Sequence, residues 1–428
     1  MRADRLAMLL AALVALGGCS SDSGGPPHHE ASRGLTTAGL NRSLAALQRI
    51  ARQNGGTRAA GTPGFRASAD YVAARLAHAG WTVTRQDVPF TFFRLKSASL
   101  SVGGRRLRAA RDFQVLSYSG SGRARGPLRG VGLGCAEGDF KGLRAGELPL
   151  AQRGGNCFFH DKARNAERAG AKALLVVESV LSRRGVPSGT LGFPGIRIPV
   201  LVMSSRALGG GRRAALHVDA AMRAATTENV IAETPGGNGG HVVMAGGHLD
   251  SVRGGPGIED NGTGVATLIG AAGAIGPNPP GAKLRFAFWA AEELGLLGSR
   301  HYVDSLDKQE RQRISAYLNF DMVGSPNPVP QVYADGSPRL ARALRRADGG
   351  RLGGASVGGA SDHALFQAAG IPVNGLYTGS DETGPGGKPR DPCYHLACDT
   401  IHNVDRPMLL RMARTATRAL RALSAQAK

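Results

Sequence analysis

The sequence is poor in aromatic residues and in acidic residues. Phe, Trp and Tyr make up 5% of the 428 residues, and 53 Lys and Arg stand against 32 Asp and Glu, which gives a net charge of +21. A basic balance of this size can favour nucleic acid or an anionic surface. The arginines are scattered, however, and no basic stripe carries interleaved aromatic residues. We therefore expect no nucleic-acid partner and a general surface bias with some attraction to anionic components of the cell envelope.

Long apolar runs and several catalytic motifs are also missing. The apolar run over residues 6–16 is too short to span a bilayer well. No HExxH zinc helix occurs, and no Ser–His–Asp set accompanies a nucleophile elbow. Segment 276–283 has Ala282 at the position where a phosphate loop has its lysine. The sequence thus gives no support to a zinc-helix protease, a serine hydrolase or a P-loop nucleotide-binding protein.

The first residues are typical of an exported protein. Arg2 and Arg5 precede the apolar run, and small residues then lead to Cys19. This order is the pattern of a signal peptide, and a cysteine directly after the small residues resembles a bacterial lipobox. We expect residues 1–19 to be a lipoprotein-type signal peptide with Cys19 lipidated, and residues 20–36 to be a flexible tether. The protein would be lipid-anchored at the outer face of the bacterial cell membrane, or secreted if the segment is an ordinary signal.

Export permits disulfide bonds. Besides the lipidation candidate the chain has four cysteines, Cys135, Cys157, Cys393 and Cys398, which allow three pairings. The pairing of sequence neighbours, 135 with 157 and 393 with 398, also respects the segment boundaries that the patterning of the chain indicates.

The pattern of apolar residues indicates an α/β fold with an insertion. Residues 37–80 have helical periodicity, and a strand follows them. From about 95 to 225 the chain changes to short strand-like pieces, Gly-rich turns and a single clear helix. Strands and helices then alternate to the end, which predicts a sheet with helices on both faces. We expect one α/β domain built from residues 37–94 and 226–428 and interrupted by an insert over residues 95–225.

Acidic residues and histidines follow several of the predicted strands. Glu292 and Glu293 come directly after the apolar run LRFAFWAA, at a position where open α/β sheets bind ligands. Adjacent carboxylates repel each other unless a positive charge is close, although acidic pairs in solvated loops are common. Other such residues are His248, Asp250, Asp260, Asp321, Tyr394, His395 and Asp399. Because most precede a glycine or a turn, we expect them to converge on one edge of the sheet.

This set of side chains suits a metal site. Imidazole nitrogens and carboxylate oxygens are zinc ligands, and two histidines with three carboxylates can hold two zinc ions if one carboxylate bridges. The charges balance, because two Zn²⁺ offset three carboxylates and one hydroxide. Positions 248 and 250 share a face of a strand, so Asp250 can fix the tautomer of His248. If one of Glu292 and Glu293 is a ligand, its neighbour is free to act as a general base on the metal-bound water.

Five motifs in this order resemble the two-zinc secreted aminopeptidase family, the bacterial leucyl aminopeptidase-like zinc exopeptidases: GGHLDSV, PGIEDNGTG, WAAEELGLLGS, NFDMVG and DPCYHLACDT. Residues 129–205 resemble the protease-associated domain inserted in that family, and the likeness covers nearly all of residues 37–425. The resemblance implies a zinc-exopeptidase fold of the phosphorylase/hydrolase-like type. This fold is a three-layer α/β/α mixed sheet, here with a mostly-β protease-associated insert.

The resemblance also implies a role for each matched residue. His248 and Asp321 would bind one zinc ion, Glu293 and His395 would bind the other, and Asp260 would bridge both.

The remaining implied roles concern catalysis. Glu292 would be the general base, Asp250 would orient the first histidine, and Tyr394 would hydrogen-bond the developing oxyanion. A disulfide between Cys393 and Cys398 would hold the ligand loop rigid.

Two positions depart from the family pattern. Ala360 stands where some members have Arg, and Glu259 stands where Asn is more usual. The neighbouring Ser361 is predicted to cap a helix, which gives Asp362 and His363 structural roles.

The sequence therefore predicts a zinc aminopeptidase that removes N-terminal residues from extracellular peptides, using a hydroxide that bridges two zinc ions. A site with three carboxylates suits the positive α-amine of a peptide with a free N-terminus. A zinc carboxypeptidase on the same fold, which needs a basic clamp for the terminal carboxylate, and a catalytically inactive peptide-binding protein are the alternatives. A full two-metal ligand set disfavours a glutaminyl cyclase. We expect a monomer that contacts the membrane only through its lipid.

Overall fold

The computed structural model describes residues 35–178, 185–380, 382–384 and 387–426. The predicted signal peptide, Cys19 and most of the predicted tether lie outside these ranges. Within them, no helix combines the length and the apolar character that crossing a membrane requires.

In the described part of the chain, 14 strands form one continuous sheet in the order β13-β12-β14-β11-β9-β10-β8-β4-β5-β6-β7-β3, with β1 paired to β8 and β2 paired to β1. The strands are β1 (Thr82–Val102), β2 (Arg105–Arg106), β3 (Phe113–Val115), β4 (Gly122–Gly130), β5 (Leu148–Gln152), β6 (Leu174–Glu178), β7 (Val200–Ser204), β8 (Arg213–Glu233), β9 (Asn238–His248), β10 (Ala282–Trp289), β11 (Ile314–Phe320), β12 (Gln331–Tyr333), β13 (Gly353–Ala355) and β14 (Val373–Tyr377).

The α-helices are α1 (Thr37–Gln53), α2 (Pro63–His78), α3 (Phe159–Arg168), α4 (Ser205–Leu208), α5 (Gly262–Ile275), α6 (Leu297–Ser305), α7 (Lys308–Arg313), α8 (Pro338–Asp348), α9 (His363–Ala368) and α10 (Arg406–Gln426). Their starts follow local chemistry: the hydroxyls of Thr36 and Thr62 accept main-chain N–H groups at the first turns of α1 and α2, and Pro63 opens α2.

The middle of the sheet is parallel and buried. β10 and β11 pair with β9 on either side in parallel, and β14 continues this pattern beside β11. The outer strands β12 and β8 pair antiparallel, so the sheet is mixed. Unbroken apolar runs such as LRFAFW fit strands that are covered on both faces. The register aligns Trp289 with His248, which brings the carboxyl ends of β9 and β10 to the same level.

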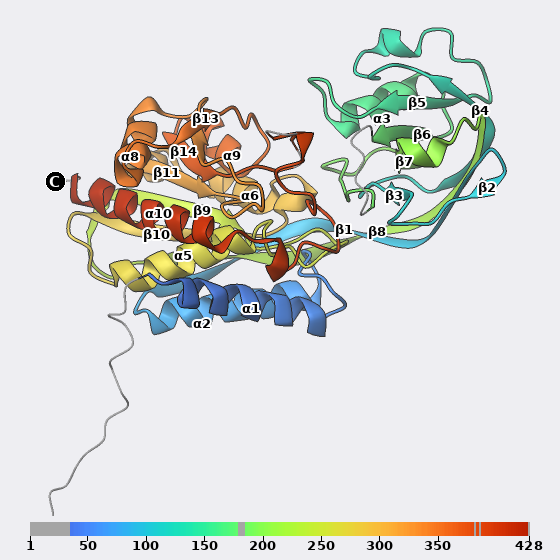
Figure 1. Cartoon of the computed structure of the whole chain (residues 1–428). Helices are drawn as coiled ribbons and strands as arrows, with labels where there is room; N and C mark the ends of the chain where they lie inside the picture. The colour runs from blue at the N-terminus through green and yellow to red at the C-terminus, as the bar shows by residue number, and fades with distance from the viewer. Residues whose placement is uncertain (1–34, 179–184, 381, 385–386, 427–428) are drawn as a thin grey trace, which may run out of the picture.

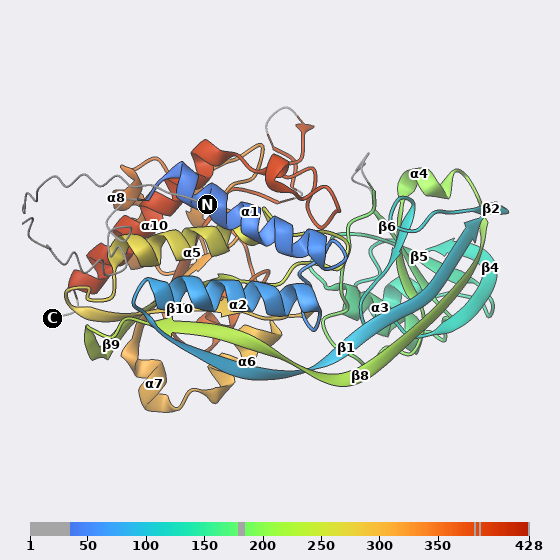
Figure 2. The ribbon, with the colours of Figure 1, turned by 90° about the horizontal axis from the view of Figure 1, so that it is seen from below.

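Helices cover both faces of this part of the sheet. α1, α2, α5 and α10 pack on one face around a large apolar core, and α6 and α9 pack on the other around Trp289, Tyr302 and Phe366 (Figures 1 and 2). The predicted three-layer α/β/α mixed sheet is confirmed.

Two long strands carry the sheet into a second lobe. β1 and β8 pair antiparallel from Thr82 and Glu233 at one end to Val102 and Ala214 at the other. Figure 1 shows them running from the helical layers into a smaller lobe built from β3–β7, α3 and α4. This lobe has apolar cores of its own and the disulfide Cys135–Cys157. The boundaries expected from the sequence, near residues 95 and 225, fall within these two strands.

Candidate active site

Five side chains predicted as metal ligands come from strand ends and two loops. His248 ends β9, Glu293 lies in the short turn after β10, and Asp321 directly follows β11. Asp260 lies just before α5, and His395 lies in the loop between β14 and α10. Because β9, β10 and β11 are parallel neighbours, their carboxyl ends meet at one edge of the sheet.

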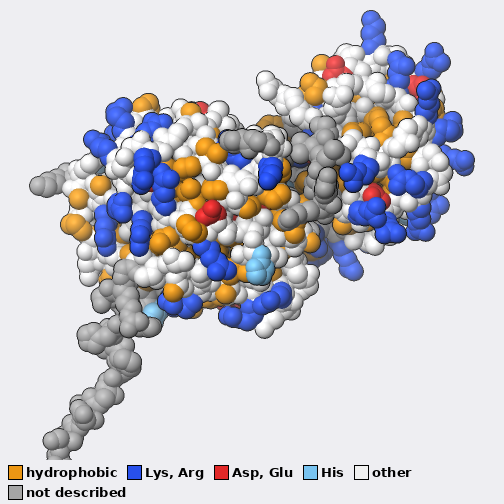
Figure 3. All heavy atoms as spheres, in the orientation of Figure 1, with side chains coloured by type: hydrophobic (Ala, Val, Ile, Leu, Met, Phe, Trp, Pro, Cys, Tyr) orange, Lys and Arg blue, Asp and Glu red, His pale blue; other side chains and the backbone are white. Residues whose placement is uncertain are grey.

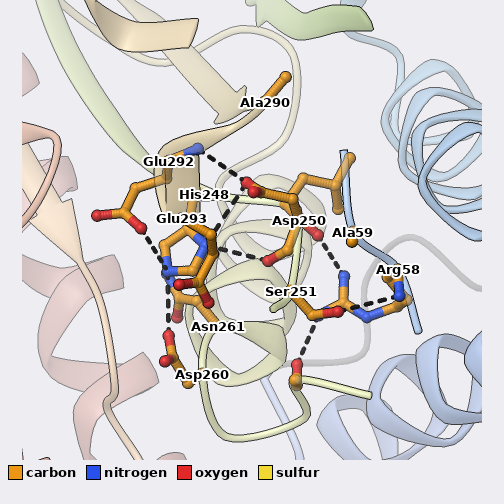
Figure 4. Close-up of polar contacts among 12 residues, drawn as sticks. Arg58, Ala59, His248, Asp250, Ser251, Asp260, Asn261, Ala290, Glu292 and Glu293 are labelled. Atoms are coloured by element: carbon orange, nitrogen blue, oxygen red, sulfur yellow. Dashed lines mark hydrogen bonds and ion pairs between the residues drawn. The ribbon is translucent and has the colours of Figure 1, made fainter. Parts of the chain in front are cut away.

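The structure brings these five side chains together around Asp260. Nε2 of His248 lies 3.1 Å from Oδ1 of Asp260 and 3.3 Å from Oδ1 of Asp321. Nε2 of His395 lies 3.1 Å from Oδ2 of Asp260 and 3.1 Å from Oε2 of Glu293. Each oxygen of the Asp260 carboxylate therefore faces a different histidine. Figure 4 shows this carboxylate below the His248 ring.

The donor atoms of this cluster fit metal ions. His248, Asp260 and Asp321 form one group, and Asp260, Glu293 and His395 form a second; in each group the donor atoms lie within 4.8 Å of one another. Oε1 of Glu293 and Oδ1 of Asp321 are buried without a hydrogen-bond partner. Buried carboxylate oxygens are costly unless a cation or a donor satisfies them, and zinc ions at these two places would do so.

The electrostatics of the cluster also call for cations. Burial alone would lower the pKa of His248, but the carboxylates of Asp321 and Glu292 outweigh burial and hold that pKa well above its usual range. The same opposition at His395, where Glu293 is the strongest charged neighbour, raises its pKa well above the usual value. The carboxylates therefore favour positive charge between them, and zinc ions would supply it.

The turn after β10 separates the two adjacent glutamates. Ala291 has a φ of 54°, a left-handed conformation, and the N–H of Glu292 donates to Oδ1 of Asp250 at 3.1 Å. Oε2 of Glu292 lies 4.0 Å from Nε2 of His248 (Figure 4), whereas Oε2 of Glu293 lies 3.1 Å from Nε2 of His395. Burial raises the pKa of Glu292 well above its usual range, which suits a group that takes up a proton.

Backbone strain is concentrated around the cluster. Besides Ala291, the residues Met322 and His395 have φ values of 54° and 57°. Met322 follows Asp321 directly, so three strained residues adjoin or belong to the predicted ligands. Such conformations cost about 1–3 kcal/mol each and persist where the surrounding structure fixes them, commonly at functional sites.

One predicted helper residue, Asp250, makes a contact that differs from the one expected. Nδ1 of His248 lies 3.1 Å from the main-chain oxygen of Asp250 and 3.8 Å from its carboxylate oxygen Oδ1. The second ring nitrogen therefore faces the main-chain carbonyl, and the Asp250 carboxylate accepts the N–H of Glu292 instead. The ring of Tyr394 stacks on that of His395, with the ring centroids 3.8 Å apart.

The insert holds one of the histidines. Nδ1 of His395 lies 2.9 Å from the main-chain oxygen of Ser188, and the N–H of Ser188 donates to the main-chain oxygen of His395 at 3.2 Å. The disulfide Cys393–Cys398 brackets the same loop. A hydrogen bond of this kind fixes the tautomer and the direction of a metal-binding ring. Sequence reasoning missed Ser188, because nothing in its local sequence marks it.

Arg58 is a second residue that the sequence did not reveal. Its side chain is fully buried, and its Nε and Nη2 donate to the main-chain oxygens of Pro256 and Gly257 at 2.8 and 2.5 Å, with a further bond from Nη1 to Leu249. Burial lowers the pKa of Arg58 to about 10, so it is charged at neutral pH. It ties the residues between β9 and α5, Asp250 among them, to the segment before α2 (Figure 4).

Two further acids support the loops of the site. The carboxylate of Asp399 accepts the main-chain N–H groups of Glu259 and Asp260 at 2.8 and 3.1 Å. The buried carboxyl group of Glu259 accepts the N–H of Gly324 at 2.9 Å. It thereby supports the loop after β11.

The prediction that Ser361 caps a helix is wrong. α9 begins at His363, its cap position is Asp362, and no side chain caps it. The hydroxyl of Ser361 donates to Oδ2 of Asp321 at 2.7 Å instead. A hydrogen bond from a hydroxyl to a carboxylate is stronger than one between two neutral groups, which favours this contact over a helix cap.

Histidines and carboxylates at the carboxyl ends of a three-layer α/β/α sheet define a metal-dependent hydrolase, and comparisons with known proteins name its family. Residues 229–420 match peptidase family M28, and residues 124–208 match the PA domain. An aminopeptidase of Pseudomonas aeruginosa is 38% identical over 424 residues, covering 88% of this chain and 79% of that protein. The chain belongs to peptidase family M28, which confirms the family predicted from the motifs.

Other relatives agree with this assignment. A "Probable lipoprotein aminopeptidase LpqL" of Mycobacterium tuberculosis is 35% identical over 415 residues, covering 88% of this chain and 82% of that protein. A solved zinc aminopeptidase of Bacillus subtilis superposes with a TM-score of 0.71 at 29% identity, over 91% of this chain and 96% of that one. An aminopeptidase of an Aneurinibacillus strain gives a TM-score of 0.73 at 27% identity, over 90% and 93% of the two chains.

Proposed function

We propose that this chain is a zinc aminopeptidase that binds two zinc ions. His248 and Asp321 hold one ion, Glu293 and His395 hold the other, and the carboxylate of Asp260 bridges them. The observation that carries the proposal is the shared position of Asp260, whose two oxygens each lie 3.1 Å from a different histidine. The membership of the chain in family M28 and its aminopeptidase relatives support the same activity.

The residues of the chain divide the chemical work around the metal ions. When bound, the zinc ions supply an activated water and polarise the carbonyl of the scissile bond. Glu292, buried beside His248, takes the proton of the attacking water and returns it to the leaving amine. Tyr394, stacked on His395, lies beside the ligands and donates its hydroxyl proton to the oxyanion.

Charge favours the amino end of a peptide as the group that is recognised. Oε2 of Glu292 and Oδ1 of Asp321 lie 4.0 and 3.3 Å from Nε2 of His248, so carboxylate oxygens gather on this side of the cluster. A protonated α-amine is attracted to such a place, whereas a terminal carboxylate is repelled. Ala360 supplies no basic group there. We therefore propose peptides with a free N-terminus as substrates.

The division of the chain and its placement in the cell are further parts of the proposal. The insert over residues 95–225 contains the PA match at 124–208 and has its own apolar cores. Export with a lipid on Cys19 is supported by the sequence of residues 1–19 and by the name of the LpqL relative. Labelling with a radioactive fatty acid, which the variant C19A should abolish, tests the anchor, and sedimentation tests the expected monomer.

The decisive experiment measures activity and metal content together. The protein without residues 1–19 is assayed on a panel of aminoacyl-p-nitroanilides, after removal of metal with a chelator and again after titration with zinc. We expect turnover to vanish with the metal and to return as two zinc ions bind per chain. Bound zinc without turnover of any member would refute the aminopeptidase and point to a carboxypeptidase. A protein that neither binds zinc nor turns over would be a peptide-binding protein.

A further inference from the structure

A cavity of about 250 Å³ lies between the peptidase part and the insert, on the Glu293 side of the cluster. Glu293 lines one end, Phe92 and Arg253 line a wall, and Gln114 and Ser188 come from the insert. Clefts that hold drug-sized molecules measure roughly 300–1,000 Å³. This cavity therefore has room for about one or two amino-acid residues.

Arg253 lines this cavity, and two further arginines lie near it. The guanidinium carbons of Arg253 and Arg223 lie 4.6 and 4.8 Å from the centre of the Phe92 ring. Such cation–π contacts hold a guanidinium group in place while its N–H groups stay free for another partner. Arg94 adds a third charge, since burial first and then Arg94 lower the pKa of Arg253. Among the described residues, no carboxylate pairs with any of these three arginines.

An unpaired arginine is not unusual by itself in this chain. With 53 Lys and Arg against 32 Asp and Glu, many cations lack an acidic partner, and Figure 3 shows them spread over both lobes. Arg253 differs in its surroundings. Its guanidinium group is fixed on an aromatic ring, and the cavity that it lines reaches a predicted metal ligand, Glu293.

The cavity thus places a basic side chain, Arg253, beside the ligand cluster, where Asp250 and Glu293 also line it. Carboxylates prevail on the His248 side, where the proposed function places the α-amine of the substrate. A peptide held there by its amino end extends past Glu293 on the leaving side, where the cavity and Arg253 follow. A short peptide is a zwitterion with matching charges at its two ends. Complementary charges of this kind give specificity.

We propose that the cavity receives the one or two residues that follow the scissile bond, and that Arg253 binds the C-terminal carboxylate of a short peptide. This inference rests on the proposed function and adds a substrate class to it, dipeptides and tripeptides with a free carboxylate. Arginine suits this role because its planar fork donates two parallel hydrogen bonds to a carboxylate. Phe92 positions the fork.

The test compares substrates that differ only in the terminal charge. Leu-Gly-Gly and its C-terminal amide are hydrolysed by the zinc-loaded protein, by R253Q and by the control R342Q, which removes an equal charge from the exposed Arg342 on α8. We expect kcat/KM for the acid to exceed that for the amide about tenfold, chiefly through KM. R253Q should abolish this ratio and leave leucine p-nitroanilide turnover unchanged, whereas R342Q should keep the ratio.

Each other outcome has a defined meaning. Equal kcat/KM for acid and amide in the unaltered protein, or a ratio that survives in R253Q, would overturn the carboxylate site. If R253Q fails to fold, F92L takes its place and should reduce the ratio at least threefold. Failure of the unaltered protein to turn over leucine p-nitroanilide would refute the proposed function instead. Cleavage of N-acetyl-Leu-Gly-Gly would do the same, by revealing a carboxypeptidase.

Discussion

Replacing Arg58 by methionine tests how the site is built. The side chain is fully buried, and its three hydrogen bonds go to main-chain oxygens of Leu249, Pro256 and Gly257. R58M leaves the buried oxygens of Leu249 and Pro256 without this donor, whereas the oxygen of Gly257 keeps the N–H of Gly262 at 3.1 Å. A lost hydrogen bond to a buried group costs about 1–2 kcal/mol, so we expect the free energy of unfolding to fall by about 2–4 kcal/mol. Such a loss is a large share of the free energy of unfolding of a typical domain, which is about 5–15 kcal/mol.

The assay is urea unfolding followed by the fluorescence of Trp81 and Trp289, both of which are buried. Zinc-loaded and chelated samples are compared, because zinc stabilises the folded state by binding to it. R66M is the matched control, since Arg66 is exposed on α2 and should cost less than about 0.5 kcal/mol. R58K separates charge from geometry, because lysine keeps the charge and cannot span three carbonyls.

We expect R58K to lose most of the stability that R58M loses. If R58K matched the unaltered protein, the charge near Asp250 and Asp260 would matter and the three hydrogen bonds would not. If R58M lost less than about 1 kcal/mol in both the loaded and the chelated form, the assignment of Arg58 as the support of this loop would be refuted.

Three other predictions test the same structure. E292Q should lower kcat about 10²–10⁴-fold while zinc titration still shows two bound ions; a loss of zinc would make Glu292 a ligand. S188P, which removes the main-chain N–H that donates to His395 and restricts the backbone there, should weaken zinc binding about tenfold in competition with a chelator, and S188A, which keeps both main-chain groups, should not. Burial opposes ionisation of Asp348, but two hydrogen bonds from Arg411 hold its pKa below the usual value. D348N should therefore lower the free energy of unfolding by about 2 kcal/mol at pH 7. In urea titrations, the difference in this free energy between D348N and the unaltered protein should disappear as the pH falls below about 4. A difference that persists at lower pH would contradict the ion pair.

The sequence revealed the elements whose chemistry is local. The run ISAYLNF is apolar throughout, and the strand β11 spans the same residues, Ile314–Phe320. The acids and histidines that follow such runs meet in space, because parallel strands place their carboxyl ends at one edge. Glu293, Asp321 and His248 follow this rule directly. For this reason the candidate ligands were found without the structure.

The supporting contacts were hidden because they join residues far apart and use main-chain atoms. Arg58 and Leu249 are 191 positions apart, and Ser188 and His395 are 207 positions apart. Every residue has a main-chain carbonyl, so no sequence pattern predicts which carbonyl will accept a given hydrogen bond. Ser361 is a further example, because its hydroxyl donates to the carboxylate of Asp321, 40 positions away, and does not cap a helix.

The insert and the cluster of predicted metal ligands are in direct contact in this chain. The insert supplies the carbonyl of Ser188 to His395, and Gln114 and Ser188 line the cavity beside Glu293. β1 and β8 stay paired across the predicted boundaries, with a register shift between Leu95 and Ser97. Deletion of residues 95–225 would therefore cut two paired strands and remove a support of the metal cluster at once. Substitutions that change one contact at a time, such as S188P and R253Q, are the variants that can separate the contribution of the insert to metal binding from its contribution to substrate choice.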